Sequence, residues 1–235
     1  MATEIQIHQA QAHILRVLLF KTEARFRDLN TIKLSTDHFT FHLKQLVDQG
    51  IVEKIDSKYR LTSKGKEFAN RFDTEKVALE RQAKIGVLII GVKQEGKTTK
   101  FLSQQRLKQP YFGYRGCVTG KIRWAEKALE TAARELKEET GLEGNLEFVG
   151  IEHKMDYSTI DGQMLEDKYF YIIKATNTKG KLIENFEGGR NSWLTEKEIL
   201  TDPKVFEDVP KILKNIKTNK FFFLEDQYFY TPSEY

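Results

Sequence analysis

One segment in the second half of the chain constrains the fold most, because it combines a charged helical face with an apolar one. A helix is predicted from about Glu126 to Thr140, with Gly141 as its stop. Three of its glutamates, at i, i+3 and i+4, share one face: Glu135, Glu138 and Glu139. The apolar residues expected on the other face are Leu129, Ala132, Ala133 and Leu136. The sequence therefore predicts a helix that buries one side against a sheet and presents three carboxylates on the other.

These clustered carboxylates predict a site for divalent cations. Each ionised carboxylate is disfavoured by its like-charged neighbours, and a bound cation removes that cost. Ligands that are all oxygen select hard cations, so we expect Mg²⁺, with Mn²⁺ as the second choice. The alternative is a solvated surface without a ligand, since glutamate-rich helices are common.

The residues around this helix also follow a recurrent signature. Residues 120–142 read glycine, five residues, glutamate, seven residues, Arg-Glu, an aliphatic residue, any residue, Glu-Glu, any residue, glycine and an aliphatic residue. This pattern resembles the signature of the Nudix hydrolase family at every fixed position. A chance match at so many fixed positions is expected well below about once in a million sequences at average residue frequencies.

The resemblance implies a fold, a reaction and a set of site residues. The implied fold is an α/β/α sandwich with a mixed sheet. The implied reaction is metal-dependent hydrolysis of the pyrophosphate bond in a nucleoside diphosphate linked to another moiety. The implied metal ligands are Glu135, Glu138, Glu139 and the carbonyl of Gly120. The implied catalytic residues are Glu135, which binds metal or takes the proton from water, Arg134, which orients a glutamate, and Glu126, which braces that arginine.

Two positions depart from what many family members carry. The sequence has Val118-Thr119-Gly120 where Pro-Gly-Gly is common, and Ala125-Glu126 where Gly-Glu is common. Neither departure falls on a fixed position of the signature, so we expect metal binding to be kept. The loop that holds the substrate is expected to differ.

Signals outside the signature are weaker. Arg106, after a predicted strand, is a candidate phosphate contact, and a surface salt bridge is the alternative. Glu187 is a candidate for one more substrate or catalytic contact, because family members often supply a glutamate from the corresponding loop; otherwise it is solvated. Three nearby aromatic residues, Tyr111, Phe112 and Tyr114, either stack on a base or pack within the protein.

The first 75 residues show a different pattern of expected helices and strands. Helical spacing around Ile14–Leu18, a short helix within Glu23–Asn30 and a helix starting at Ser35 precede two short strands, Ile51–Ile55 and Tyr59–Leu61. A further helix is expected from Thr62 to about Glu80 or Lys84. This order resembles the winged helix-turn-helix of bacterial and archaeal transcriptional regulators.

That resemblance implies double-stranded DNA as a partner, and protein docking is the alternative. The candidate nucleic-acid contacts are His38, Phe41, His42, Lys44 and Gln45 on the third helix and Lys54, Lys58 and Arg60 on the wing. Asp37 and Asp48 share the same helix and would repel phosphates. Residues 1–75 carry 12 Lys and Arg against 10 Asp and Glu, a weak electrostatic footprint. The competing function is therefore a transcriptional regulator whose second domain senses a nucleotide or ADP-ribose-like metabolite.

From about residue 84 the pattern changes to alternating strands and helices. Strands are expected at Ile85–Val92, Lys100–Gln105, Leu146–Glu152 and Lys168–Lys174, and short helices after Trp193 and over Asp208–Lys217. The fold class predicted from both halves is α+β with two domains, a winged helix-turn-helix at 1–80 and a Nudix sandwich at 81–235.

The C-terminal segment is rich in aromatic residues. Phe221–Leu224 and Tyr228–Tyr230 flank the polar tripeptide Glu225–Gln227, which suggests a hairpin. Its aromatic side chains pack on the protein's own core or form a homodimer interface.

Composition excludes several classes of protein. The longest apolar stretch, Ile85–Val92, is far shorter than the roughly 20 residues of a membrane helix, and no signal peptide is expected. A single cysteine, Cys117, excludes an internal disulfide framework and favours a reducing compartment. We therefore expect a cytoplasmic protein with no membrane partner. The net charge of +4 does not by itself indicate nucleic-acid binding.

Overall fold

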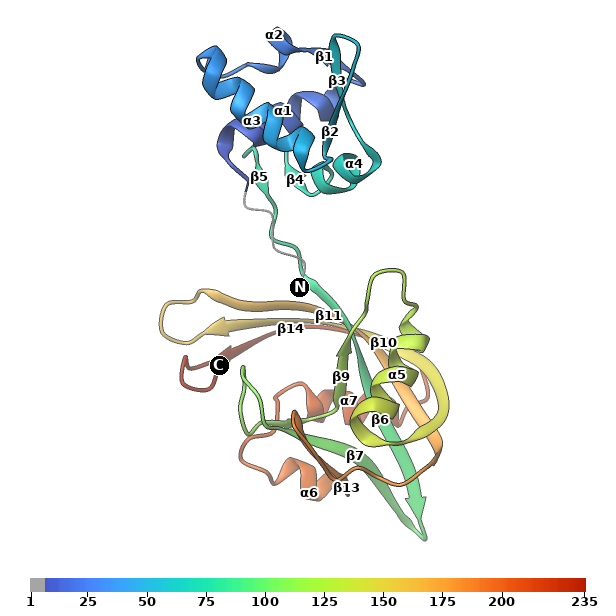
Figure 1. Ribbon diagram of the computed structural model, residues 1–235. Helices are drawn as coiled ribbons and strands as arrows, with labels where there is room; N and C mark the ends of the chain where they lie inside the picture. The colour runs from blue at the N-terminus through green and yellow to red at the C-terminus, as the bar shows by residue number, and fades with distance from the viewer. Residues whose placement is uncertain (1–6) are drawn as a thin grey trace. The chain divides into compact units, whose positions relative to one another are not determined.

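The computed structural model describes residues 7–235 of the chain (Figure 1). The chain divides into a first compact unit that ends at Arg81 and a second compact unit, Gln82–Tyr235.

The first unit combines helices with a three-stranded antiparallel sheet of order β1-β3-β2. Its leading elements are α1 (Gln9–Phe20), β1 (Ala24–Arg25), α2 (Phe26–Leu29), α3 (Thr36–Asp48), β2 (Val52–Ile55), β3 (Lys58–Leu61) and α4 (Ser63–Ala69). The core is formed by apolar side chains from all the helices, among them Ile14, Leu29, Phe39, Leu46 and Phe68. Ser35 stands at the N-cap of α3 as expected, although its side chain makes no capping hydrogen bond.

The prediction of one long helix from Thr62 to about Glu80 or Lys84 is wrong. Helix α4 ends at Ala69, and the chain then forms a small hairpin of β4 (Phe72–Asp73) and β5 (Ala78–Leu79). The carboxylate of Asp73 accepts hydrogen bonds from the amides of Glu75 (2.9 Å) and Lys76 (3.0 Å). These local bonds stabilise a turn where the sequence pattern suggested more helix.

The second unit is built on a mixed nine-stranded sheet whose main path is β12-β13-β7-β6-β11-β10-β14. Its strands are β6 (Lys84–Glu95), β7 (Thr98–Arg106), β8 (Arg115–Gly116), β9 (Val118–Lys121), β10 (Glu143–Ser158), β11 (Met164–Lys179), β12 (Asn185–Phe186), β13 (Gly189–Leu194) and β14 (Phe222–Tyr230). Pairing is parallel between β6 and β11 and between β10 and β14, and antiparallel elsewhere on this path. The expected strands are all present, and several are longer than predicted.

Helices cover both faces of this sheet. Helix α5 (Ala128–Thr140) packs on one face with Val87, Ile89 and Ile173. Helices α6 (Glu196–Leu200) and α7 (Val209–Ile216) pack on the other face with Leu88, Ile90 and Ile172. The consecutive run Val87–Ile90 is fully buried because its alternate side chains serve the two layers.

The apolar face of α5 differs from the prediction in part. Ala132 and Leu136 are buried, but Leu129 and Ala133 are exposed, and Thr131 and Thr140 take buried positions instead. The Thr140 hydroxyl donates to the Leu136 carbonyl within the helix, which satisfies its hydrogen-bonding needs in the core.

The prediction of a C-terminal hairpin is also wrong. Residues 222–230 form one continuous strand, β14, that pairs in parallel with β10. Glu225–Gln227 lie in the middle of this strand rather than in a turn. Phe222, Tyr228 and Tyr230 are buried while Phe223 and Phe229 are exposed, so the aromatic residues divide between the two faces of the sheet.

No helix within residues 7–235 is long and apolar enough to cross a membrane.

Candidate active site

Arg134 organises the carboxylates on α5. Its Nε donates to Oε1 of Glu126 at 2.7 Å and its Nη2 donates to Oε2 of the same carboxylate at 2.9 Å. Its Nη1 donates to Oε1 of Glu135 at 2.7 Å and to Oε2 of Glu138 at 3.3 Å. The predicted residues Glu126, Arg134, Glu135 and Glu138 are therefore brought together by one guanidinium group.

The ion pair between Arg134 and Glu126, which is made by two hydrogen bonds, has an electrostatic consequence. The hydrogen bonds from Arg134 lower the pKa of Glu126 to about 2, because they stabilise its ionised form. The same pair raises the pKa of Arg134. Glu126 also accepts a hydrogen bond from the backbone amide of Arg123 (3.1 Å), so it joins the loop before α5 to the helix.

Glu135 lies directly against Gly120 of β9. A Cβ atom added to Gly120 would overlap Cγ and Cδ of Glu135, so only glycine leaves room for this carboxylate. The carbonyl of Gly120 lies against β6, since a Cβ atom on Gly86 would be 2.7 Å from it. The close approach of β9 and α5 therefore fixes where the Glu135 carboxylate lies.

Glu139 occupies a more enclosed place than Glu138. The side chain of Glu139 is 14% exposed and that of Glu138 is 54% exposed. Burial raises the pKa of Glu139, although the hydrogen bond from Gln104 acts in the opposite direction. Nε2 of Gln104 donates to Oε2 of Glu139 at 2.9 Å, and Nζ of Lys108 lies 4.0 Å from Oε1.

Three polar residues at this site were not predicted: Gln104, Lys108 and Asn191. Nδ2 of Asn191 donates to the carbonyls of Glu139 (2.7 Å) and Ile183 (2.8 Å), and its Oδ1 lies 3.2 Å from Nε2 of Gln104. Asn191 is fully buried in β13, and Gln104 lies beside it in β7. The polar end of the strand Lys100–Gln105 was the available signal for Gln104.

A hollow of about 420 Å³ opens beside these residues. It is lined by Leu182, Glu184, Asn185, Arg190, Asn191, Ser192 and Trp193. Asn191 lines this hollow and also donates to the carbonyl of Glu139, so the hollow lies next to the C-terminal end of α5.

The donor set fits a hard divalent cation by its chemistry. Three carboxylates share one helical face, and all their ligand atoms are oxygen. Within residues 7–235, no group of three His, Cys, Asp or Glu side chains converges in this conformation on a common metal position. The physical reason at α5 is the Arg134 guanidinium, which bonds to both Glu135 and Glu138. The exposed Glu138 side chain is the one most free to turn towards a cation.

The two candidate substrate contacts lie in different surroundings. The Arg106 guanidinium donates to the carbonyls of Pro110 and of Gln109 (3.2 Å), and thus braces the loop after β7. Glu187 is exposed in the turn between β12 and β13, with no side-chain partner among residues 7–235. Of the three aromatic candidates, Tyr111 and Tyr114 are buried in an aromatic cluster with Tyr228 and Tyr230, whereas Phe112 is exposed.

The candidate nucleic-acid contacts are distributed over α3 and the β2–β3 hairpin. His38, Phe41 and Lys44 are exposed on α3, and Lys54 is exposed on β2. The other two α3 residues make contacts inside the unit, since the His42 ring stacks on His8 with centroids 4.1 Å apart and Gln45 accepts a hydrogen bond from Gln11.

Two of the hairpin cations are paired. Lys58 forms an ion pair with Glu23, and Nε of Arg60 lies 2.7 Å from Oε1 of Glu53. Exposed pairs of this kind contribute little to stability, but they reduce the positive potential of the hairpin.

Comparisons with known proteins bear on the second unit. Residues 81–216 match the family model for the NUDIX domain. The chain is similar to the solved structure of the mutator MutT protein from Bacillus halodurans, with 25% identity, a TM-score of 0.51 and coverage of 65% of this chain and 93% of that one. It is also similar in fold to the NUDIX domain of NrtR from Shewanella oneidensis, solved with ADP ribose, with 17% identity, a TM-score of 0.51 and coverage of 65% and 96%. No curated protein matches the sequence.

Proposed function

The chain belongs to the Nudix family, and from this premise we propose that its second unit hydrolyses the pyrophosphate bond of a nucleoside diphosphate linked to another moiety. The family model confirms the resemblance of residues 120–142 and the mixed α/β fold expected for this half of the chain. The observation that carries the proposal is the arrangement of Glu126, Arg134 and Glu135 beside Glu138 and Glu139 on α5.

A divalent cation is part of this proposal. Glu138 and Glu139 would hold Mg²⁺ or Mn²⁺, with Glu135 as a further ligand or as the group that takes the proton from water. Such an ion, when bound, neutralises charge on the phosphate oxygens and lowers the pKa of a bound water. The carbonyl of Gly120, which lies against β6 in this conformation, is proposed as a further ligand on the family resemblance alone.

The protein's own residues prepare the site for this reaction. Arg134 and Gly120 place the carboxylate of Glu135, and Gln104 and Asn191 fix Glu139 and its backbone. Fixed placement before the substrate binds lowers the entropic part of the barrier. Lys108, with its ammonium 4.0 Å from Glu139, adds positive charge on the side from which an anionic substrate would approach.

Arg106 and Glu187 remain proposed substrate contacts. The bonds of Arg106 to Gln109 and Pro110 give it a positioning role as well, because they order the loop that carries Lys108. Glu187 supports it by its position in a turn where no protein partner engages its carboxylate among the described residues.

A screen of nucleoside diphosphate compounds tests the proposal. Full-length protein is incubated with Mg²⁺ or Mn²⁺ and compounds such as ADP-ribose, dinucleoside polyphosphates and oxidised nucleoside triphosphates, and phosphate products are measured. Glu138→Gln and Glu139→Gln should abolish turnover, while Glu147→Gln, an exposed glutamate outside the site, should leave it unchanged. Absence of turnover by the wild-type protein with every compound would contradict the enzyme proposal.

A second candidate function is regulation of transcription through the first unit. The order of its elements, with α3 followed by the β2–β3 hairpin and the sheet order β1-β3-β2, supports a winged helix-turn-helix spanning about residues 1–80. The exposed His38, Phe41 and Lys44 on α3 support contact with a DNA groove. In this proposal the Nudix unit senses a nucleotide or an ADP-ribose-like metabolite, the ligand class seen with the NrtR domain.

Electrophoretic mobility shift with the DNA upstream of the protein's own gene tests this candidate. Binding should weaken as salt rises, because phosphate contacts release counterions. Lys44→Glu should weaken binding, while Lys97→Glu, the same charge change in the β6–β7 turn, should not. Binding that is absent, or unaffected by salt and by Lys44→Glu, would remove the regulatory proposal without affecting the hydrolase proposal.

A further inference from the structure

The two edges of the nine-stranded sheet differ in their protection. One edge is β12, which is only two residues long, and short strands are a common means of blocking further pairing. The other edge is β14, with nine residues that pair with β10 without any register shift. β14 contains neither lysine nor proline, and no strand lies on its outer side within residues 7–235.

The backbone of β14 presents a row of hydrogen-bonding groups at this edge. The carbonyl of Tyr230 accepts from the amide of Thr159, which directly follows β10. Backbone groups alternate in direction along a strand. The N–H and C=O groups of the even-numbered residues of β14 therefore point towards β10, and those of the odd-numbered residues point outward. The outward groups belong to Phe223, Glu225, Gln227 and Phe229, and no backbone partner engages them within the described chain.

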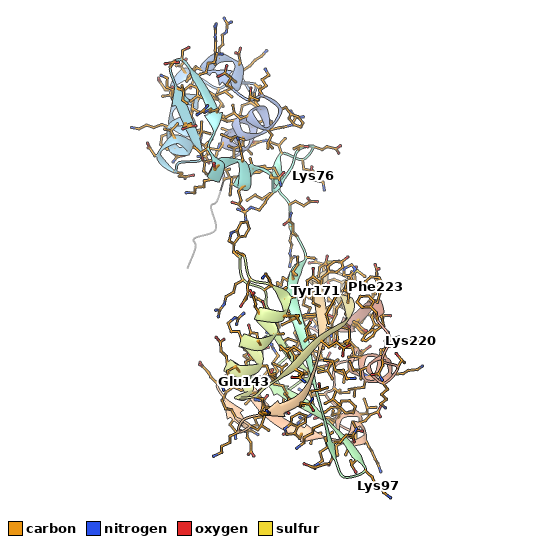
Figure 2. All side chains as sticks on the ribbon, turned by 90° about the vertical axis from the view of Figure 1, so that its right-hand side faces the viewer. Lys76, Lys97, Glu143, Tyr171, Lys220 and Phe223 are labelled. Atoms are coloured by element: carbon orange, nitrogen blue, oxygen red, sulfur yellow. The ribbon has the colours of Figure 1, made fainter. Side chains whose placement is uncertain are left out.

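The side chains of these four residues share one face of the sheet, and the two at its ends are aromatic. Phe223 and Phe229 are each 54% exposed, and Phe229 stacks on Tyr157 with centroids 5.8 Å apart. In the strand register, Ile151 lies between Tyr171 and Phe223, both labelled in Figure 2, so this face continues onto β10 and β11. An exposed, regular, aromatic edge strand of this length is a template for another strand.

The residues of β14 are complementary to β14 itself in an antiparallel arrangement. About a two-fold axis at Asp226, Phe223 is opposite Phe229 and Glu225 is opposite Gln227, and both pairs use the outward backbone groups. On the other face Phe222 is opposite Tyr230 and Leu224 is opposite Tyr228. Aromatic pairs are favourable between directly opposed strand residues, and the Glu225 carboxylate can accept a hydrogen bond from the Gln227 amide. We propose that β14 pairs with β14 of a second copy of this chain about this axis, which joins the two sheets into one.

The centre of the proposed pairing needs one compensating contact, and the structure supplies it. Asp226 would face Asp226 of the other copy, and like charges directly opposite destabilise a strand pair. Nζ of Lys211 lies 2.8 Å from Oδ1 of Asp226, so each copy brings its own neutralising cation. Moving the axis to Glu225 would oppose two glutamates and place Phe223 against Gln227, so the side chains select Asp226.

The mass of the full-length protein in solution is the first test. Light scattering during size-exclusion chromatography should give twice the 27.4 kDa of one chain. Gln227→Pro removes an outward amide without removing a bond to β10, so it should raise the dimer dissociation constant by at least about tenfold. Phe223→Lys should act in the same direction, while Ile160→Lys, an equally drastic change at an exposed residue between β10 and β11, should not.

A disulfide tests the register directly. In the proposed dimer the Asp226 residues form a non-hydrogen-bonded pair with Cα atoms about 4.5 Å apart, close enough for a cysteine bridge. Asp226→Cys should therefore crosslink quantitatively on oxidation. Gln227→Cys should not crosslink, because the two copies of residue 227 are offset along the strands. The wild type should not crosslink either, since its single cysteine is Cys117.

The outcomes separate this proposal from its alternatives. A wild-type monomer at tens of micromolar would overturn it. A dimer that resists Gln227→Pro and Phe223→Lys, and in which Asp226→Cys does not crosslink, would place the interface elsewhere and would also overturn it. Hydrolysis measurements are not part of either test, so the result is independent of the proposed function.

Discussion

Arg134 and Glu126 form a two-point ion pair, with Nε 2.7 Å from Oε1 and Nη2 2.9 Å from Oε2. Glu126 precedes helix α5 and Arg134 lies two turns into it, so the pair fixes the loop against the helix. The remaining nitrogen of the same guanidinium reaches Glu135. The position of the Glu135 carboxylate therefore depends on a planar group that is itself held at two points.

Replacing Arg134 by lysine should lower the catalytic rate while the protein stays folded. Lysine keeps the charge but cannot bond to Glu126 and Glu135 in one plane. A displacement of about 1 Å in a catalytic group costs on the order of 100-fold in rate. Steady-state kinetics on the best substrate of the screen should therefore show a loss of about that size for Arg134→Lys, and a rate equal to wild type would contradict the role given to this residue.

The same ion pair predicts how stability depends on pH. The pKa of Glu126 is lowered from 4.5 to about 2 in the folded protein, chiefly by its hydrogen bonds with Arg134. A lowered carboxyl pKa stabilises the folded state above the unfolded-state pKa, and that stabilisation is lost as pH falls towards about 2. The difference in unfolding free energy between wild type and Glu126→Gln should be constant above about pH 5 and shrink below it. A difference that stays constant down to about pH 2 would contradict the role given to this ion pair.

The local part of the site could be predicted from the sequence, and the part assembled from distant strands could not. Glu126, Arg134, Glu135, Glu138 and Glu139 lie within one loop and helix, so helical spacing and the family signature were sufficient to group them. Gln104 and Asn191 reach Glu139 only because β7 and β13 are paired in the sheet. Nothing in the spacing of a single sequence specifies that pairing.

The same distinction explains the errors in secondary structure. The C-terminal aromatic residues suggested a hairpin because a polar tripeptide separates them, but their partner is β10, far away in the chain. The helix expected after Thr62 ends early because the side chain of Asp73 stabilises a turn. Both outcomes depend on contacts that a periodic pattern does not encode.

Removing the Gln104 side chain should weaken metal activation. Its amide fixes Oε2 of the buried Glu139 at 2.9 Å, and groups that orient a metal ligand typically contribute about 10- to 100-fold to metal affinity. Gln104→Ala should raise the Mg²⁺ concentration for half-maximal activity by at least about tenfold. Gln94→Ala, which removes an exposed strand glutamine, is the matched control, and an equal effect of both changes would exclude the proposed role of Gln104.

Ala125 adopts a left-handed backbone conformation, with φ at 64°. An L-residue pays about 1–2 kcal/mol there and glycine does not, although glycine loses more entropy on folding. Ala125→Gly should therefore stabilise the second unit by about 0.5–1 kcal/mol. Unfolding is best followed by tryptophan fluorescence, since both tryptophans, Trp124 and Trp193, belong to this unit. Ala133→Gly, within helix α5, should instead destabilise by about 1 kcal/mol, and the same sign for both variants would contradict the argument.

Lys154 and Asp208 form a buried ion pair, with Nζ 2.7 Å from Oδ1 and side chains only 4% and 6% exposed. Removing one partner leaves the other charge buried without compensation, which typically costs about 3–5 kcal/mol. Lys154→Met should therefore lower the unfolding free energy by about that amount, measured by denaturant titration of tryptophan fluorescence. The double variant Lys154→Met/Asp208→Leu removes both charges and should recover most of the loss, since an apolar pair of similar volume can replace a buried ion pair. If the double variant were as unstable as Lys154→Met, the loss would come from packing of the lysine against Phe206 and Tyr228, or from the buried Glu152 whose charge Lys154 also offsets, rather than from the unpaired Asp208.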